Sequence, residues 1–221
     1  MSMDKMIPLM LGGIKDTLYM TTVSTLFAYL LGLPIAILLV LTAPSGLKPQ
    51  KLVYRLLDMI VNIFRSIPFL ILMILVIPVT RAIAGKAYGS TATIVPLVIA
   101  AAPYVARMIE SSLLEVDPGV IEAAQSMGAS IPTIIFKVLI PEAKTSLIVG
   151  ATISCGTILG YSAMSGAIGG GGLGQIAISY GYNRYQTDVL FITVALLIVL
   201  MQVIQVVGMK ISRKTDKRVR N

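Results

Sequence analysis

The chain has 221 residues, of which 56% are hydrophobic and 13% are charged, and its mean hydropathy is +0.88. Soluble domains carry about 25% charged residues, so this composition excludes an ordinary soluble domain and predicts an integral membrane protein. The formal net charge of +8 is compatible with nucleic-acid binding, but the basic residues flank apolar segments, where the positive-inside rule places them in membrane proteins, so no nucleic acid is expected as a partner.

The apolar segments predict an all-α fold with five transmembrane helices in one domain over residues 1–221. A helix that crosses about 30 Å of hydrocarbon needs about 20 mostly apolar residues. The second span is interrupted by Asp58 and Arg65, and the fourth leads into the glycine-rich stretch Gly166–Gly174. The expected spans are Thr17–Leu41, Leu56–Val79, Ser90–Ala106, Ser146–Ser165 and Val189–Met209.

The segment Met1–Asp16 before the first span is short and polar and has no small-residue cleavage site, so no removable signal peptide is expected. The sequence contains no internal repeat that would divide the chain into two matched halves. Five spans are too few to surround a solute path, which predicts a homodimer with the path on its two-fold axis.

The distribution of lysine and arginine predicts the orientation. An external N-terminus and a cytoplasmic C-terminus place the basic loop after the first span, the loop between residues 107 and 144, and the basic tail inside. The outside then holds only five basic residues, which are Lys5, Lys15, Arg81, Lys86 and Arg184.

The large cytoplasmic loop, residues 117–141, predicts two short helices. Asp117 is suited to N-cap the first, with Pro118 at its first position. Gly128 is suited to end it, because glycine accepts the left-handed conformation of a helix terminus. Ser130 is suited to cap a second helix that Pro141 stops.

Both predicted helices have surfaces suited to close packing. Ala123 and Ala124 of the first allow close approach, and the second has an apolar stripe of Ile131, Ile134, Ile135 and Val138. Such a pair fits a groove on a partner protein. The alternative is an ordinary helical loop that rests on the membrane surface.

The spacing of Glu122-Ala123-Ala124, Gly128 and Val138-Leu-Ile-Pro141 resembles the EAA coupling loop of ABC importer permeases. Val138 and Ile140 depart conservatively from that pattern. The resemblance implies that Glu122, Ala123, Ala124, Gly128 and Pro141 couple the membrane helices to an ATPase.

Several further segments are similar to the methionine-importer permease family. These are Asn62–Phe69, Ala102–Glu110, Gly160–Gly166, Gly171–Gln175 and Tyr180–Tyr182. The resemblance implies a homodimer in the bacterial plasma membrane, two ATP-binding cassette subunits and an external substrate-binding lipoprotein. The implied substrate is methionine, as the D- or L-enantiomer or both.

No motif in the sequence predicts that this chain is itself an enzyme. Gly169, Gly171 and Gly174 match G-x-G-x-x-G but follow an apolar helix, whereas a dinucleotide site needs a preceding strand. No P-loop sequence occurs, so ATP hydrolysis is expected in a separate subunit. With no histidine and a single cysteine, Cys155, a His/Cys metal site is excluded, and no cofactor is expected.

Two groups within the spans are candidates for the solute path. Arg65 either lines an inner vestibule or pairs with an acid such as Glu110. Met164 either packs in the core or, as the family resemblance implies, closes the path on the dimer axis. Tyr161, Ser162 and Ser165 are the candidate path-lining neighbours of Met164.

The sequence therefore predicts an importer subunit that works by alternating access. An ion-coupled secondary transporter is the first alternative, although the spans lack the paired acids or histidines and the repeats that such a carrier uses. A membrane scaffold that transports nothing is the second.

Overall fold

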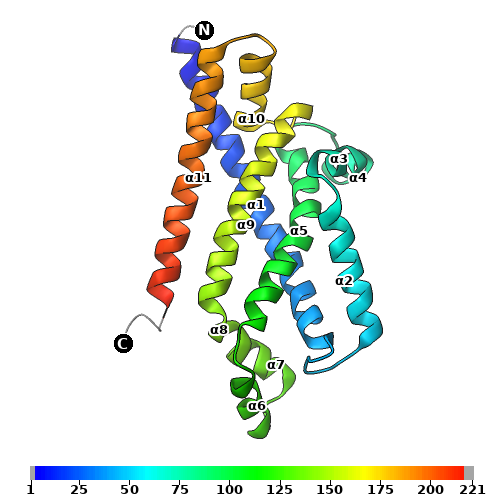
Figure 1. The fold of residues 1–221 in the computed structure, drawn as a ribbon. Helices are drawn as coiled ribbons and strands as arrows, with labels where there is room; N and C mark the ends of the chain where they lie inside the picture. Colours follow the sequence, from blue (N-terminus) through cyan, green and yellow to red (C-terminus); the bar gives the residue numbers. More distant parts are fainter. Residues whose placement is uncertain (1–2, 217–221) are drawn as a thin grey trace. The chain divides into compact units, whose positions relative to one another are not determined.

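The computed structural model describes residues 3–216, and within that range every regular element is a helix (Figure 1). The long helices are α1 (Met3–Thr42), α5 (Ser90–Leu114), α9 (Lys144–Ser165) and α11 (Thr187–Thr215). In the described part of the chain, four helical segments are long and apolar enough to cross a membrane, and a fifth is counted if one bent pair forms a single span. The predicted all-α membrane fold is confirmed.

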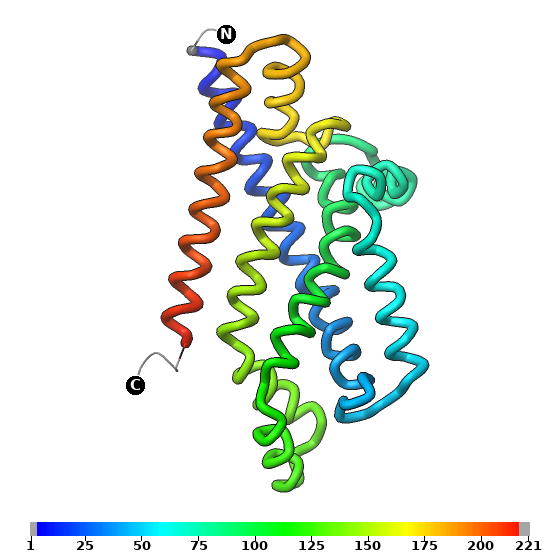
Figure 2. Tube along the Cα trace, viewed as in Figure 1, coloured from blue at the N-terminus to red at the C-terminus, as the bar shows by residue number. Residues whose placement is uncertain are grey.

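The chain folds into two compact units, each built from three separate stretches, which the colours of Figure 2 help to trace. Unit 1 contains the described residues up to 28, residues 67–101 and residues 155–205. Unit 2 contains residues 29–66, residues 102–154 and the described residues from 206 onward.

Helix α1 begins well before the predicted span, because Met3–Asp16 is helical as well. Its buried positions in this part recur at helical spacing and include Met10, Gly13 and Thr17. A Cβ atom on Gly13 would lie 2.5 Å from Cδ1 of Ile176, so the glycine permits close packing there. Tertiary packing thus extends the helix beyond its uncharged part.

The second predicted span, Leu56–Val79, is wrong as one continuous helix. The chain forms α2 (Lys51–Ser66), α3 (Phe69–Leu75) and α4 (Ile77–Ala84), with a sharp bend between α2 and α3. Pro68 lies at the break with φ −57° and ψ 134°, outside the helical region. Proline has no N–H to donate and disfavours a helical residue before it, which explains the interruption.

The remaining spans differ from prediction mainly in length. Helix α5 does not end at Ala106 but continues to Leu114, and α11 extends beyond Met209 to Thr215. Helix α9 ends at Ser165, the predicted residue.

The glycine-rich stretch of unit 1 is tightly packed. It contains the turn η2 (Gly166–Ile168), the short helix α10 (Gly172–Ile176) and the π-helical η3 (Ala177–Tyr182). The hydroxyl of Thr17 accepts a hydrogen bond from the Leu173 amide at 2.9 Å, and the Thr93 hydroxyl donates to the Gly170 carbonyl at 3.0 Å. A Cβ on Gly174 would collide with the backbone of Ala163. The glycines here permit close backbone approach.

Candidate functional site

The first helix of the predicted coupling loop forms as its local chemistry indicates. Helix α6 (Pro118–Ser126) is capped by Asp117, whose Oδ1 accepts a hydrogen bond from the Gly119 amide at 2.7 Å. Gly128 ends it in the left-handed conformation, with φ +76°. The Ala129 amide donates to the Ala124 carbonyl at 3.1 Å, which completes the helix terminus.

The second helix differs from the prediction. It begins as α7 (Ile131–Ile134), continues as the π-helical η1 (Ile135–Leu139) and ends in the turn α8 (Ile140–Glu142). Ser130 occupies the N-cap, but its hydroxyl lies 2.9 Å from the Thr133 hydroxyl and caps no backbone amide. The prediction that Pro141 stops the helix is wrong, because Leu139 before it and Ala143 after it both have helical backbone conformations.

The predicted apolar stripe of this helix faces the protein itself. Ile134 and Ile135 are buried, and Ile131 and Val138 are partly buried. Ile135 lines a small apolar hollow together with residues of α1 and α5. The stripe therefore packs the second helix against the rest of unit 2. This leaves α6 as the surface that a partner could contact.

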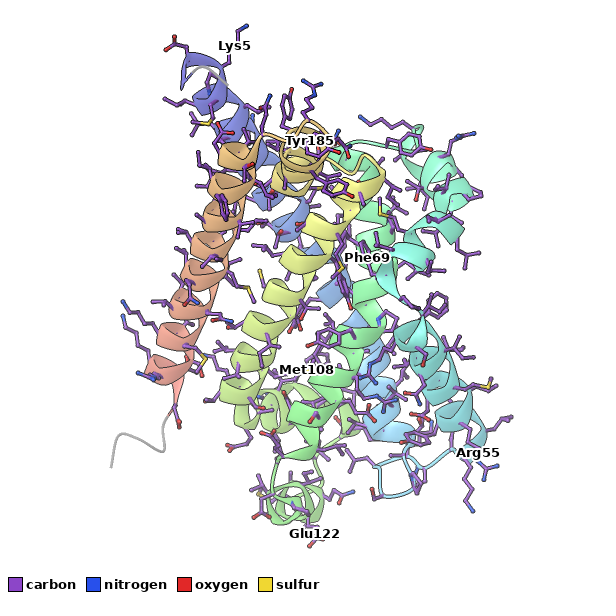
Figure 3. The ribbon with its side chains drawn as sticks, turned by 45° about the horizontal axis from the view of Figure 1, so that its top comes forward. Lys5, Arg55, Phe69, Met108, Glu122 and Tyr185 are labelled. Carbon is purple, nitrogen blue, oxygen red and sulfur yellow. The ribbon has the colours of Figure 1, made fainter. Side chains whose placement is uncertain are left out.

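The exposed face of the helix pair carries residues that sequence reasoning missed. Glu122 and Ala123 are exposed, and Figure 3 shows Glu122 on α6 at the tip of unit 2. Met127 is 81% exposed and Phe136 63% exposed, and both lie in the loop outside the predicted spans. The signal for Phe136 in the sequence was its position outside the apolar stripe of the second helix, whereas Met127 follows α6 and had no comparable signal. Exposed apolar residues of this kind mark protein contact sites.

An acidic cavity lies at the base of the helix pair in unit 2. Its volume is about 410 Å³, and four carboxylates line it, those of Glu115, Asp117, Glu142 and Asp216. No basic side chain is among the described residues that line it. Four carboxylates without a basic lining residue make this an acidic site.

An ion cluster joins α2 to α5 within unit 2. Nη2 of Arg107 lies 2.6 Å from Oδ1 of Asp58, and Nη1 lies 2.7 Å from Oε2 of Glu110. Arg107 also donates to the Asn62 side chain at 3.1 Å. The Glu110 side chain is only 5% exposed, so its charge depends on this partner.

Of the two alternatives for Arg65, a direct ion pair with Glu110 is not formed, because Arg107 is the cation in contact with that carboxylate. Arg65 is exposed on α2 and takes no part in the ion pairs of this cluster. The sequence did contain a signal for the correct pair, since Arg107 and Glu110 are three residues apart on one helix.

The gate candidates divide into exposed and buried side chains. Met164 is 51% exposed, and the Tyr161 ring stacks on Phe69 with centroids 4.7 Å apart and 3° between the planes. Ser162 and Ser165 are buried in unit 1, and their hydroxyls donate to the backbone carbonyls of Leu159 and Ser162. The two serines therefore stabilise the end of α9 and are not exposed to a path in this chain.

Comparison with known proteins gives consistent matches. Residues 29–221 match the family described as the binding-protein-dependent transport system inner membrane component. The probable D-methionine transport system permease protein MetI of Vibrio cholerae is 48% identical over 210 residues, which covers 95% of this chain and 93% of that protein. The methionine import system permease protein MetP of Bacillus subtilis is 46% identical over 181 residues, or 82% of each chain.

The fold is also similar to a solved structure. A chain of the MetNI methionine ABC transporter in an inward-facing conformation superimposes with a TM-score of 0.96 and 46% sequence identity. The match covers 98% of this chain and 100% of that one.

Proposed function

The chain belongs to the family of binding-protein-dependent transport system inner membrane components, and we propose from this premise that it is the permease subunit of an ATP-driven methionine importer. The similarity to methionine permeases over nearly the whole chain is the observation that carries the proposal. Because the sequence has no P-loop, a separate subunit must hydrolyse ATP.

The proposed assembly is a homodimer with two ATP-binding cassette subunits and an external substrate-binding lipoprotein. Its N-terminus is external and its C-terminus cytoplasmic, as the distribution of basic residues favours. This orientation places α6, with Glu122 and Ala123 exposed, on the side where the ATPase is found.

Docking would use the exposed face of the helix pair. Met127 and Phe136 supply apolar contact area, and the neighbouring acidic cavity favours basic residues of the ATPase. Gly128 and Asp117 fix the shape of α6, and Pro141 lies where the pair joins α9. A rigid pair held in this way transmits movement of the ATPase to the membrane helices.

Transport would follow from two arrangements of the dimer. ATP binding must favour one arrangement over the other, since a ligand shifts an equilibrium only by its difference in affinity for the two states. The loaded binding protein would release methionine into the outward-open cavity, and ATP hydrolysis would restore the inward-open state.

Within unit 1, Met164 is the proposed gate. Its thioether is exposed in the single chain, and two such side chains meeting on a dimer axis would seal the path with apolar contact. Tyr161 supports it through its stack on Phe69. In unit 2, the exposed Arg65 is the proposed lining residue of an inner vestibule, where water can solvate its charge.

Met164→Ala is expected to raise methionine leak and basal ATP hydrolysis in proteoliposomes several-fold, because the smaller side chain leaves the path open. Ile153→Ala changes another exposed apolar residue of α9 and serves as the control. Equal leak in the two variants would assign Met164 to packing.

Uptake of labelled methionine by the reconstituted complex tests the function itself. We expect uptake that requires ATP, the binding protein and this chain together. Uptake driven by an ion gradient without ATP would instead support a secondary transporter, and no uptake by an intact complex would support a scaffold.

A further inference from the structure

Unit 1 contains a second cavity that no part of the proposed transport path uses. Its volume is about 400 Å³, and it lies between the N-terminal part of α1 and the segment formed by α10 and η3. Residues of α1 from Pro8 to Asp16 form one wall, and residues from Gly171 to Tyr180 form the other.

Glycines create the shape of this cavity. A Cβ atom on Gly12 would meet no atom within 4 Å, so this residue leaves open space on the α1 side. On the opposite wall, Gly171 and Gly172 have φ values of +94° and +70°, which side chains rarely tolerate. Larger residues at these positions would fill or distort the cavity.

The chemistry of the lining fits a cation. Asp16 is the acidic residue of the lining, and Gln175, Ser179 and Tyr180 are lining residues whose side chains carry an oxygen atom. No lysine or arginine is among the described lining residues, and Asp16 forms no ion pair within the described part of the chain. A partly buried carboxylate is stabilised by a nearby positive charge, so an ammonium or guanidinium group suits this cavity.

Exposed aromatic residues border the cavity. Tyr180 lines the cavity, and the guanidinium of Arg184 lies over its ring, 4.4 Å from the ring centroid. The adjoining residues Tyr182 and Tyr185 are 72% and 89% exposed, and Figure 3 labels Tyr185. Tyr185 also has φ +55°, a strained conformation for an aromatic residue that projects its ring from the chain. Tyrosine and arginine are the residues that dominate protein interfaces.

The length of α1 places this surface near or beyond the membrane boundary. The helix has 40 residues and is therefore about 60 Å long, roughly twice the thickness of the hydrocarbon. Its uncharged part begins after Asp16, so the cavity wall from Pro8 to Asp16 precedes the apolar span. In the proposed orientation this end is external.

We propose that the cavity and its tyrosine border form a docking site for the external binding protein, and that the cavity receives a lysine or arginine side chain from that protein. The inference rests on the proposed function, which supplies the partner and places this end of α1 outside. Asp16 in the cavity lining provides charge recognition, and Tyr182 and Tyr185 provide contact area around the cavity.

The test measures the dissociation constant of the purified binding protein for the complete transporter in lipid nanodiscs. Gly12→Phe, which fills the open space, and Asp16→Asn, which removes the charge, are each expected to weaken binding about tenfold. The controls are Leu11→Phe and Asp4→Asn, which introduce the same residues at positions of α1 outside the cavity lining and should leave the constant unchanged. Thermal unfolding verifies that all four variants are folded.

An unchanged dissociation constant in both folded cavity variants would overturn the docking site. Loss of affinity only in nanodiscs that contain phosphatidylethanolamine would also overturn it, because the cavity would then hold a lipid ammonium group. Labelling of Tyr185→Cys by an impermeant reagent, in a Cys155→Ala background, separates this inference from the proposed orientation. Labelling only from the cytoplasmic side would contradict the orientation. External labelling, together with an unchanged dissociation constant of the binding protein for both cavity variants, would contradict the docking site alone.

Discussion

Gly128→Val is expected to lower the affinity of the permease for the ATP-binding subunit about tenfold. Gly128 has φ +76°, and a β-branched residue in the left-handed conformation costs about 1–2 kcal/mol. A Cβ atom there would meet no atom within 4 Å, so the penalty comes from the backbone alone. The valine would displace the end of α6 and with it the exposed face on which docking depends. The dissociation constant of the purified complex measures the effect.

Gly128→Asn is the matched control, because asparagine tolerates the left-handed conformation better than other residues with side chains. This variant should retain most of the affinity. If valine and asparagine weaken the complex equally, the conformation of Gly128 does not determine docking, and the proposed role of the α6 terminus is wrong.

Arg107→Met is expected to destabilise the permease by about 3 kcal/mol, because it removes the shared cation of Asp58 and Glu110. Glu110 is the more costly acid to leave unpaired, since its side chain is 5% exposed whereas that of Asp58 is 33% exposed. For a chain of this size the loss corresponds to a fall of about 6–12 °C in the unfolding midpoint. Thermal unfolding of the detergent-purified protein measures it.

A second substitution tests the electrostatic explanation. Arg107→Met combined with Glu110→Leu removes the buried charge together with its partner and should recover at least half of the lost stability. Arg65→Met removes an exposed arginine of α2 and should change the midpoint little. Equal destabilisation by Arg65→Met and Arg107→Met would show that the ion cluster contributes nothing specific.

The first helix of the predicted coupling loop could be predicted because its determinants are close in sequence. Asp117 caps α6 through an amide two residues away, and Gly128 ends the helix through its own backbone conformation. The presence of the long apolar helices could be predicted for a similar reason, since a membrane-spanning helix needs only a sufficiently long apolar segment.

Features that depend on distant residues were predicted less well. Arg107 pairs with Asp58 across 49 positions of sequence, and no local pattern distinguished this acid from others. The orientation of the second loop helix likewise follows from packing of Ile135 against residues of α1 and α5. Sequence periodicity identified an apolar stripe correctly but could not determine whether it faces the chain itself or a partner.

The helix break at Pro68 and the early start of α1 illustrate two different errors. The proline was visible in the sequence, but average hydropathy over Leu56–Val79 concealed its local effect on the backbone. The predicted span began at Thr17, after the charged residues, yet contacts of Gly13 with α10 favour a helix that starts earlier. The start of α1 is therefore determined by tertiary packing and not by the local sequence.

The location of α6 is the most direct test of this account. A single cysteine at Glu122, an exposed position of α6, in a Cys155→Ala background can be labelled with an impermeant maleimide in intact cells and in inverted membrane vesicles. We expect labelling in inverted vesicles only, and its loss when the ATP-binding subunit is bound. Labelling in intact cells would place α6 outside the cell, where no ATPase could contact it, and would contradict the proposed coupling.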